Sequence, residues 1–238
     1  MVKLGRLKKE LLKAKDNKKA KFLAGFFKTG KGQYAEGDLF LGLTVPRQRE
    51  IAKKYPDLSL SQIQQLLNSK YHEFRLCALL ILISKYNKSD EKTKAKIVTF
   101  YLKNTKRINN WDLVDLSAEY ILGSYLLERD KSVLYKLAKS QNLWERRIAI
   151  IATFFFIRKD QFTDTFKIAQ ILLGDKHDFI HKAVGWMLRE VGKRNEVLLI
   201  KFLDKFKGKM PRTALRYAIE RFNQQKRLSY LKGTPNIP

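Results

Sequence analysis

Apolar residues recur every three or four positions through most of this chain, which is the spacing of an amphipathic α-helix. The pattern is clearest in five segments, residues 71–86, 91–104, 142–159, 163–174 and 178–193. Short polar joints separate them, with the sequences NKSD, KSQN and GDKHD. No proline lies between residues 57 and 210, and no glycine lies between 43 and 122. Because the usual helix breakers are missing and no hairpin signal is present, the pattern predicts an all-α fold.

The helices repeat at a nearly constant period. Five residues that each open a similar amphipathic helix follow one another at intervals of 36, 36, 35 and 30: Arg75, Trp111, Arg147, Lys182 and Arg212. Another helix fits between each pair, so the unit is a helical hairpin of the length found in α-solenoids. An accidental spacing in a chain of short helices is the alternative. The repeat favours an α-solenoid of HEAT-like hairpins with a concave face for an extended ligand.

We expect a single repeat domain over residues 1–238. Its special parts are a basic N-terminal helix at 1–20, a glycine-containing loop at 29–45 and a C-terminal tail at 226–238. No apolar run reaches the ~18–20 residues of a membrane span, and the charged N-terminus does not resemble a secretory signal. We therefore expect a cytoplasmic protein.

Cysteine and histidine are scarce. The single cysteine, Cys77, excludes a disulfide within the chain. One cysteine and three histidines do not make a typical closed zinc site, and the histidines show no partner pattern. We expect no metal and no cofactor.

Charge is the first indication of function. The chain has 49 Lys+Arg against 23 Asp+Glu, a net charge of +26. Residues 1–21 carry +7 of this and residues 189–232 carry +9. A polyanion is the natural partner, because each neutralised phosphate releases counterions. Nucleic acid fits best, an anionic membrane is second, and a merely solvated surface is the plain alternative.

The repeat register places a carboxylate among aromatic and basic side chains. Trp111 and Asp115 are four residues apart and share a helix face, and Trp186 follows Lys182 by the same interval. If the second helix of each repeat lines the concave face, one channel is lined by Arg75, Trp111, Asp115, Arg147, Lys182 and Trp186.

Each candidate also has a structural interpretation. Both tryptophans could belong to the core, Asp115 could form an ion pair with an arginine, and Arg146 with Arg147 could be solvated. Asp112 lies in the first helical turn, where an acid is favoured, so we expect a structural role for it. Neither a serine-hydrolase elbow around Ser117 nor a phosphate-binding loop in GKGQY is present.

At these residues the chain resembles a known family. The strings GDLFLGLTVPRQRE (37–50), NNWDLVD (109–115), NLWERR (142–147) and KAVGWMLRE (182–190) resemble the AlkD-like DNA alkylation repair enzymes, which are alkylpurine DNA glycosylases built of HEAT-like repeats. The resemblance covers roughly residues 20–225. It implies that Asp115 is the catalytic carboxylate, that Trp111 and Trp186 pack on the lesion-bearing nucleotide, and that Arg147 contacts the DNA backbone.

The chain also departs from the family pattern. Phe26 replaces a cleft tyrosine that some members carry on the second helix, and Tyr34 in the following loop is a possible substitute. A lysine found after the Arg147 position in some members falls near Phe155 here. These changes bear on lesion preference and DNA affinity more than on the chemistry.

The resemblance and the residue types together predict a DNA glycosylase that releases N3-methyladenine and N7-methylguanine from double-stranded DNA. A cationic base already leaves readily, so one carboxylate suffices where ordinary glycoside hydrolases use two. The family reads such lesions without the base-flipping pocket common in glycosylases. We expect a monomer that does not bind a membrane. The alternatives are a non-catalytic helical-repeat protein that binds DNA or RNA, and a protein-interaction scaffold.

Overall fold

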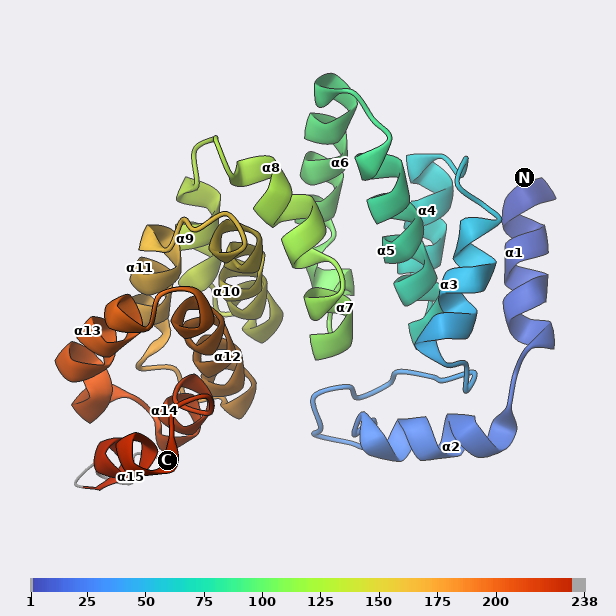
Figure 1. Cartoon of the computed structure of the whole chain (residues 1–238). Coiled ribbons are helices and arrows are strands. Elements are labelled where there is room, and N and C mark those ends of the chain that lie inside the picture. The colour runs from blue at the N-terminus through green and yellow to red at the C-terminus, as the bar shows by residue number, and fades with distance from the viewer. Residues whose placement is uncertain (1, 233–238) are drawn as a thin grey trace. The chain divides into compact units, whose positions relative to one another are not determined.

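The computed structural model describes residues 2–232, and all regular elements within that range are helical, with a long loop at residues 27–44 (Figure 1). The only extended pairing in this range is an isolated bridge between Leu39 and Tyr71. The all-α prediction is confirmed. The contacts divide the chain into two compact units, residues 2–117 and 118–232, which are described separately.

The first unit holds seven α-helices and one short 3₁₀ turn at Thr105–Arg107 among its described residues. The helices are α1 (Val2–Lys13), α2 (Asn17–Phe26), α3 (Val45–Lys53), α4 (Leu60–Leu67), α5 (His72–Asn87), α6 (Glu91–Lys103) and α7 (Trp111–Asp115). Both α3 and α4 pack on α5, which is buried along most of its length.

The second unit begins with a π-helical turn and continues as paired helices. Its elements are the π turn (Glu119–Gly123), α8 (Ser124–Leu126), α9 (Ser132–Ala138), α10 (Leu143–Ile157), α11 (Thr163–Leu172), α12 (Asp178–Arg194), α13 (Glu196–Phe206), a 3₁₀ turn (Lys207–Lys209), α14 (Arg212–Ala218) and α15 (Gln224–Leu231). Helices α10, α12 and α14 pack one on the next, while α9, α11 and α13 pair with them.

The five helices predicted from periodicity are confirmed, each within two residues at either end. The polar joints supply their caps. Asp90 accepts a hydrogen bond from the Thr93 amide at 2.8 Å and so begins α6, and Asn142 accepts one from the Trp144 amide at 2.9 Å and begins α10. Such caps are each worth ~1 kcal/mol, so the joints help to define where the helices start.

The basic helix predicted over residues 1–20 is shorter in the structure, since α1 ends at Lys13 and residues 17–20 already belong to α2. The break falls at Asp16, whose side chain caps α2 through the Lys19 amide and whose own amide donates to Leu41 O at 2.9 Å. Gly42 makes this approach possible, since a Cβ there would lie 2.3 Å from Asp16 O and its φ is +89°. The basic N-terminus is therefore folded onto the unit.

The glycine-containing segment lies between α2 and α3, as expected, and it has its own small core of Phe27, Ala35 and Phe40. At the other end of the chain, part of the predicted tail is the helix α15. Tyr230 is buried there, and its hydroxyl donates to Asp204 Oδ1 at 2.9 Å. Residues 233–238 of that predicted tail lie outside the described residues, and the predicted concave basic cleft stays a prediction.

Candidate functional site

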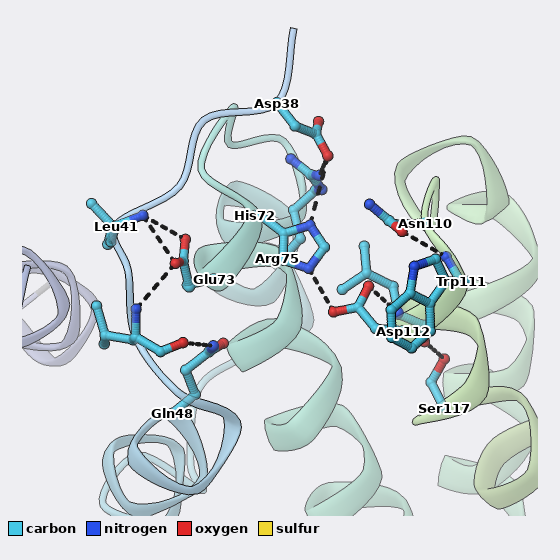
Figure 2. A network of polar contacts seen from close by, with 12 residues as sticks. Asp38, Leu41, Gln48, His72, Glu73, Arg75, Asn110, Trp111, Asp112 and Ser117 are labelled. Atoms are coloured by element: carbon cyan, nitrogen blue, oxygen red, sulfur yellow. Dashed lines mark hydrogen bonds and ion pairs between the residues drawn. The ribbon is translucent and has the colours of Figure 1, made fainter. Parts of the chain in front are cut away.

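The WDLVD string forms the five-residue helix α7. The buried Asn110 caps its N-terminus, since the Asn110 side chain accepts a hydrogen bond from the Trp111 amide at 2.8 Å. Trp111 and Asp115 stand one helical turn apart and are both half-buried. Asp112 points the other way, into the protein, where it is 8% exposed (Figure 2). The helix thus presents one carboxylate beside an indole and buries the other, as the sequence predicts.

Aromatic side chains surround Trp111 within the first unit. Its ring stacks on Phe27 at a centroid distance of 5.5 Å and meets the edge of Phe26 at 6.3 Å. Tyr34 packs on the same cluster. Burial raises the pKa of the Tyr34 hydroxyl, while a hydrogen bond from the Trp111 side chain opposes the shift. The structure therefore brings together three residues singled out from sequence: Phe26, Tyr34 and Trp111.

A buried chain of charges lies behind α7 (Figure 2). His72 Nε2 is 2.7 Å from Asp112 Oδ2, and its Nδ1 is 3.6 Å from Asp38 Oδ2, an ion-pair distance longer than a hydrogen bond. The same Asp38 oxygen accepts from Arg75 Nη2 at 2.5 Å. These four residues, which we call the Arg75–Asp112 network, join the loop after α2, the start of α5 and helix α7.

The network favours the charged form of its histidine. Burial alone would lower the pKa of His72, but the Asp112 and Asp38 carboxylates outweigh it and raise that pKa above its ordinary value. Burial likewise works against the Asp38 carboxylate, and the neighbouring His72 and Arg75 nevertheless lower its pKa. Two cations and two anions therefore face one another in this buried place.

The loop after α2 is held to α5 by a second buried acid. Glu73 accepts hydrogen bonds from the backbone amides of Leu41 at 2.9 Å, Gly42 at 2.8 Å and Leu43 at 3.3 Å (Figure 2). Gln48 on α3 donates to Leu43 O at 2.9 Å. Because three amides converge on one carboxylate, the loop that carries Tyr34 is anchored at its far end.

Two expectations need correction here. The sequence predicts that Arg75 lines the channel, but Arg75 is only 2% exposed. Its guanidinium donates hydrogen bonds to Ser69 O and to Asp38, and these bonds connect the turn before α5 to the preceding loop. The histidines were expected to lack partners, yet His72 joins two carboxylates. Its partners are 34 and 40 residues away, so no local spacing marks them. The one available signal is that His72 and Asp112 both lie in the first turn of a predicted helix.

Asp115 lies close to a second polar group of the first unit. The Tyr101 hydroxyl, fully buried, shares a 2.8 Å hydrogen bond with Ser117 Oγ, which donates to Leu113 O at 2.6 Å. Burial raises the pKa of Tyr101, and the negative charge of Asp115 raises it further. These bonds fix the end of α7 on which Asp115 stands.

The remaining predicted site residues belong to the second unit. Trp186 is half-buried on α12 and meets the edge of Phe154 at 5.7 Å. Arg147 is 5% exposed, and its guanidinium donates to Phe179 O at the start of α12. Lys182 is more open and pairs with Asp178 at 2.6 Å. The phosphate contact predicted for Arg147 stays a prediction, and a binding test of it needs a parallel measurement of stability.

The described residues contain neither a metal-binding cluster nor a membrane-spanning helix. Within residues 2–232 no group of three or more His, Cys, Asp or Glu side chains is arranged to hold a metal ion. No helix in this range is long and apolar enough to cross a membrane.

Comparison with known proteins bears on the family and the fold. Residues 7–222 match the family model described as "DNA alkylation repair enzyme". A solved structure described as "Predicted DNA alkylation repair enzyme from Enterococcus faecalis" is similar, with a TM-score of 0.71 and 17% identity, over 88% of this chain and 97% of that one. AlkD2 from Streptococcus mutans aligns with a TM-score of 0.57 and 15% identity, over 86% and 97% of the two chains. A search of curated proteins gave no match.

Proposed function

This chain belongs to the DNA alkylation repair enzyme family, and we propose that it is a DNA glycosylase acting on cationic alkylated purines in duplex DNA. Its substrates would be N3-methyladenine and N7-methylguanine. The observation that carries the proposal is the division of labour on α7, where Asp115 and Trp111 share one side while Asp112 is turned inward to His72.

The positive charge of the alkylated base explains why one carboxylate is enough. When the bond between C1′ and the base nitrogen breaks, its electron pair neutralises the base, so no acid has to protonate the leaving group. The sugar becomes oxocarbenium-like, and a fixed anion beside it lowers the energy of that state. Water then bonds to C1′ and gives up a proton, for which Asp115 is the acceptor in this proposal.

The aromatic residues have a related role. Trp111, held by Phe26 and Phe27, would place its π face near the developing positive charge. Tyr34 would line the same place from the loop. In the second unit we keep Trp186 and Arg147 in the proposal as contacts to the sugar and to a phosphate, with the many lysines supplying the rest of the backbone binding.

The decisive experiment measures release of free N7-methylguanine from duplex DNA under single-turnover conditions. We expect Asp115→Asn to slow release at least about tenfold, or ~1.4 kcal/mol of barrier, with little change in DNA affinity. Asp112→Asn is the matched control, since it changes the same group on the same helix. We expect it to lower the free energy of unfolding in urea, because the His72 contact is altered. Release by Asp115→Asn at the rate of the unchanged protein would remove Asp115 from the mechanism.

The leaving-group argument has its own test. Hypoxanthine, uracil and ethenoadenine are neutral, so their release would require protonation of the leaving base, a role that this proposal assigns to no residue. A time course over duplexes that differ only in the lesion should show release of the charged bases and retention of the neutral ones. Comparable rates for both classes would contradict the single-carboxylate mechanism. Tight DNA binding with no release of any base would instead favour a non-catalytic binding protein.

A further inference from the structure

Helix α2 carries a pair of exposed aromatic rings, Phe22 and Phe26, of which the proposed chemistry uses only Phe26, as a support for Trp111. Phe22 is 70% exposed and Phe26 is 55% exposed, and their rings stack with a centroid distance of 6.3 Å and an angle of 16° between their planes. Being four residues apart, they lie on one side of the helix. Single exposed apolar residues are ordinary, but two parallel rings form a flat platform available to a planar ligand.

A hollow lies beside this platform, within the first unit. Its volume is about 480 Å³, and we call it the α2 hollow. It is lined by residues of α2, the loop that follows it, α3, α5 and α7, among them Phe22, Phe26, Phe27 and Phe40. The walls are mostly phenyl and aliphatic side chains, and the size is within the range of small-ligand sites.

The surroundings of the hollow are strongly basic. Residues 17–35 contain five lysines and no acidic residue. Four of these lysines are exposed: Lys18, Lys19, Lys21 and Lys28. Lys19 forms an ion pair with Asp16 at 3.4 Å. An apolar site ringed by cations favours a ligand that combines a flat apolar group with a polyanionic backbone. An unpaired stretch of nucleic acid has this combination.

The platform is continuous with the candidate site. Phe26 meets Trp111 at 6.3 Å, and Trp111 stands on the same helix as Asp115. An aromatic line thus runs from Phe22 through Phe26 to Trp111. A base that leaves the duplex near the attacked nucleotide would find a surface to stack on within the same unit.

We propose that the α2 hollow is a binding site for an unstacked nucleobase of the bound DNA, which stacks on Phe22 and Phe26 while the adjoining phosphates meet the lysines of α2. This inference rests on the proposed function in taking DNA as the ligand, and it adds a base-binding site to it. Stacking on aromatic side chains tolerates any base, so the site recognises an unpaired base and not a sequence.

The test compares two duplexes that differ at one position, a 2-aminopurine that is either paired with thymine or left unpaired in a bulge. Stacking on the protein is read from 2-aminopurine fluorescence, and affinity from titration at several salt concentrations. Phe22→Ala should lose at least about fivefold in affinity for the bulged duplex and should leave the paired duplex unchanged. Its salt slope should not change, because no phosphate contact is removed.

Two variants serve as comparisons. Leu12→Ala removes another exposed apolar side chain of the first unit, 45% exposed on α1, and should affect neither duplex. The double variant Lys18→Ala with Lys21→Ala should weaken both duplexes alike and flatten the salt dependence. Because Phe22 is so exposed, its variant should unfold in urea at the same midpoint as the unchanged protein.

Several outcomes would overturn the inference. Binding of both duplexes by Phe22→Ala with the affinities of the unchanged protein would do so, and so would loss of the same preference in Leu12→Ala. If Phe22→Ala lost binding to vesicles of phosphatidylglycerol and phosphatidylcholine while keeping its preference for the bulge, the platform would be a lipid-binding surface. Failure of the glycosylase proposal is separate, since it is read from base release. Phe22-dependent binding without base release would leave the base site standing and refute the enzyme.

Discussion

The two units use an arginine in the same way at the fourth residue of a helix, Arg75 in α5 and Arg146 in α10, so the structural equivalent of Arg75 is Arg146 and not Arg147, as the predicted register has it. In the first unit Arg75 donates to Ser69 O at 2.9 Å and to Asp38 at 2.5 Å. In the second, Arg146 donates to Ser140 O at 3.0 Å and to Asp175 at 2.5 Å. Each arginine ties the turn six residues before it to a nearby acid, so this contact belongs to the repeat and not to a ligand.

What differs is how far the contact extends. In the second unit it ends at Asp175, whose backbone oxygen also contacts His181 Nε2 at 2.6 Å. In the first unit Asp38 lies next to His72, which passes the contact on to Asp112 on α7. A general device for joining helices is thus extended in one unit to hold the helix that carries Trp111 and Asp115. The comparison indicates that buried ion pairs stabilise the short helix α7 in the first unit. The second unit is stabilised by apolar packing between longer helices.

The largest effect should come from breaking the network at Asp38. Asp38→Ala leaves the Arg75 and His72 side chains, each 3% exposed, without their shared carboxylate, and we expect a loss of about 3–5 kcal/mol in the free energy of unfolding. Urea titration measures it.

Two further acid-to-alanine variants sharpen this prediction. Asp175→Ala should cost less than Asp38→Ala, since the Arg146 side chain is 19% exposed. Asp57→Ala breaks an exposed pair with Lys3 and should leave the free energy of unfolding almost unchanged. Equal losses for Asp38 and Asp57 would contradict the importance of the network.

A smaller loss is expected from the apolar packing of the second unit. A Cβ on Gly185 would lie 2.4 Å from Ala214 O and 2.5 Å from Tyr217 Cβ, so α12 and α14 would have to separate. We expect Gly185→Ala to lower the free energy of unfolding by about 1–3 kcal/mol. Gly174→Ala is the control, because no atom lies within 4 Å of its added Cβ. A neutral Gly185→Ala would show that these helices are not in close contact.

The smallest effect is a pH dependence confined to the first unit. The raised pKa of His72 contributes stability below its unfolded value of about 6.5, and this is lost as the pH rises through the folded value. The lowered pKa of Asp38 contributes stability above its unfolded value of about 3.9, and this is lost as the pH falls through the folded value. The window therefore lies between about pH 4 and 6.5, set by the groups facing His72: Asp38, Asp112 and Arg75.

The measurement compares the unchanged protein with His72→Gln in urea at pH 5.5 and pH 8.5. The difference in unfolding free energy should be larger at pH 5.5, by about 1.4 kcal/mol for each unit by which the histidine pKa is raised. A constant difference for His72→Gln would mean that its charge does not matter.

Much of the candidate site could be predicted from sequence. The WDLVD string places Trp111 and Asp115 on one side of a helix, and the position of Asp112 in the first helical turn indicated its structural role. Phe26 and Tyr34 were predicted only through the family resemblance, and the structure brings both to Trp111. The roles of Asp115, Trp186 and Arg147 in catalysis and binding remain predictions.

The sequence by itself determined the helices, their joints and the period of the repeat, because helical hydrogen bonds and caps connect residues within a few positions. Tertiary structure alone decided which charges are buried together. Arginine is usually a surface residue. The burial of Arg75 is favourable only because Asp38, which lies on a distant loop, forms an ion pair with it. The same holds for His72, whose charge depends on acids 34 and 40 residues away, and for the α2 hollow, whose walls come from four helices and a loop.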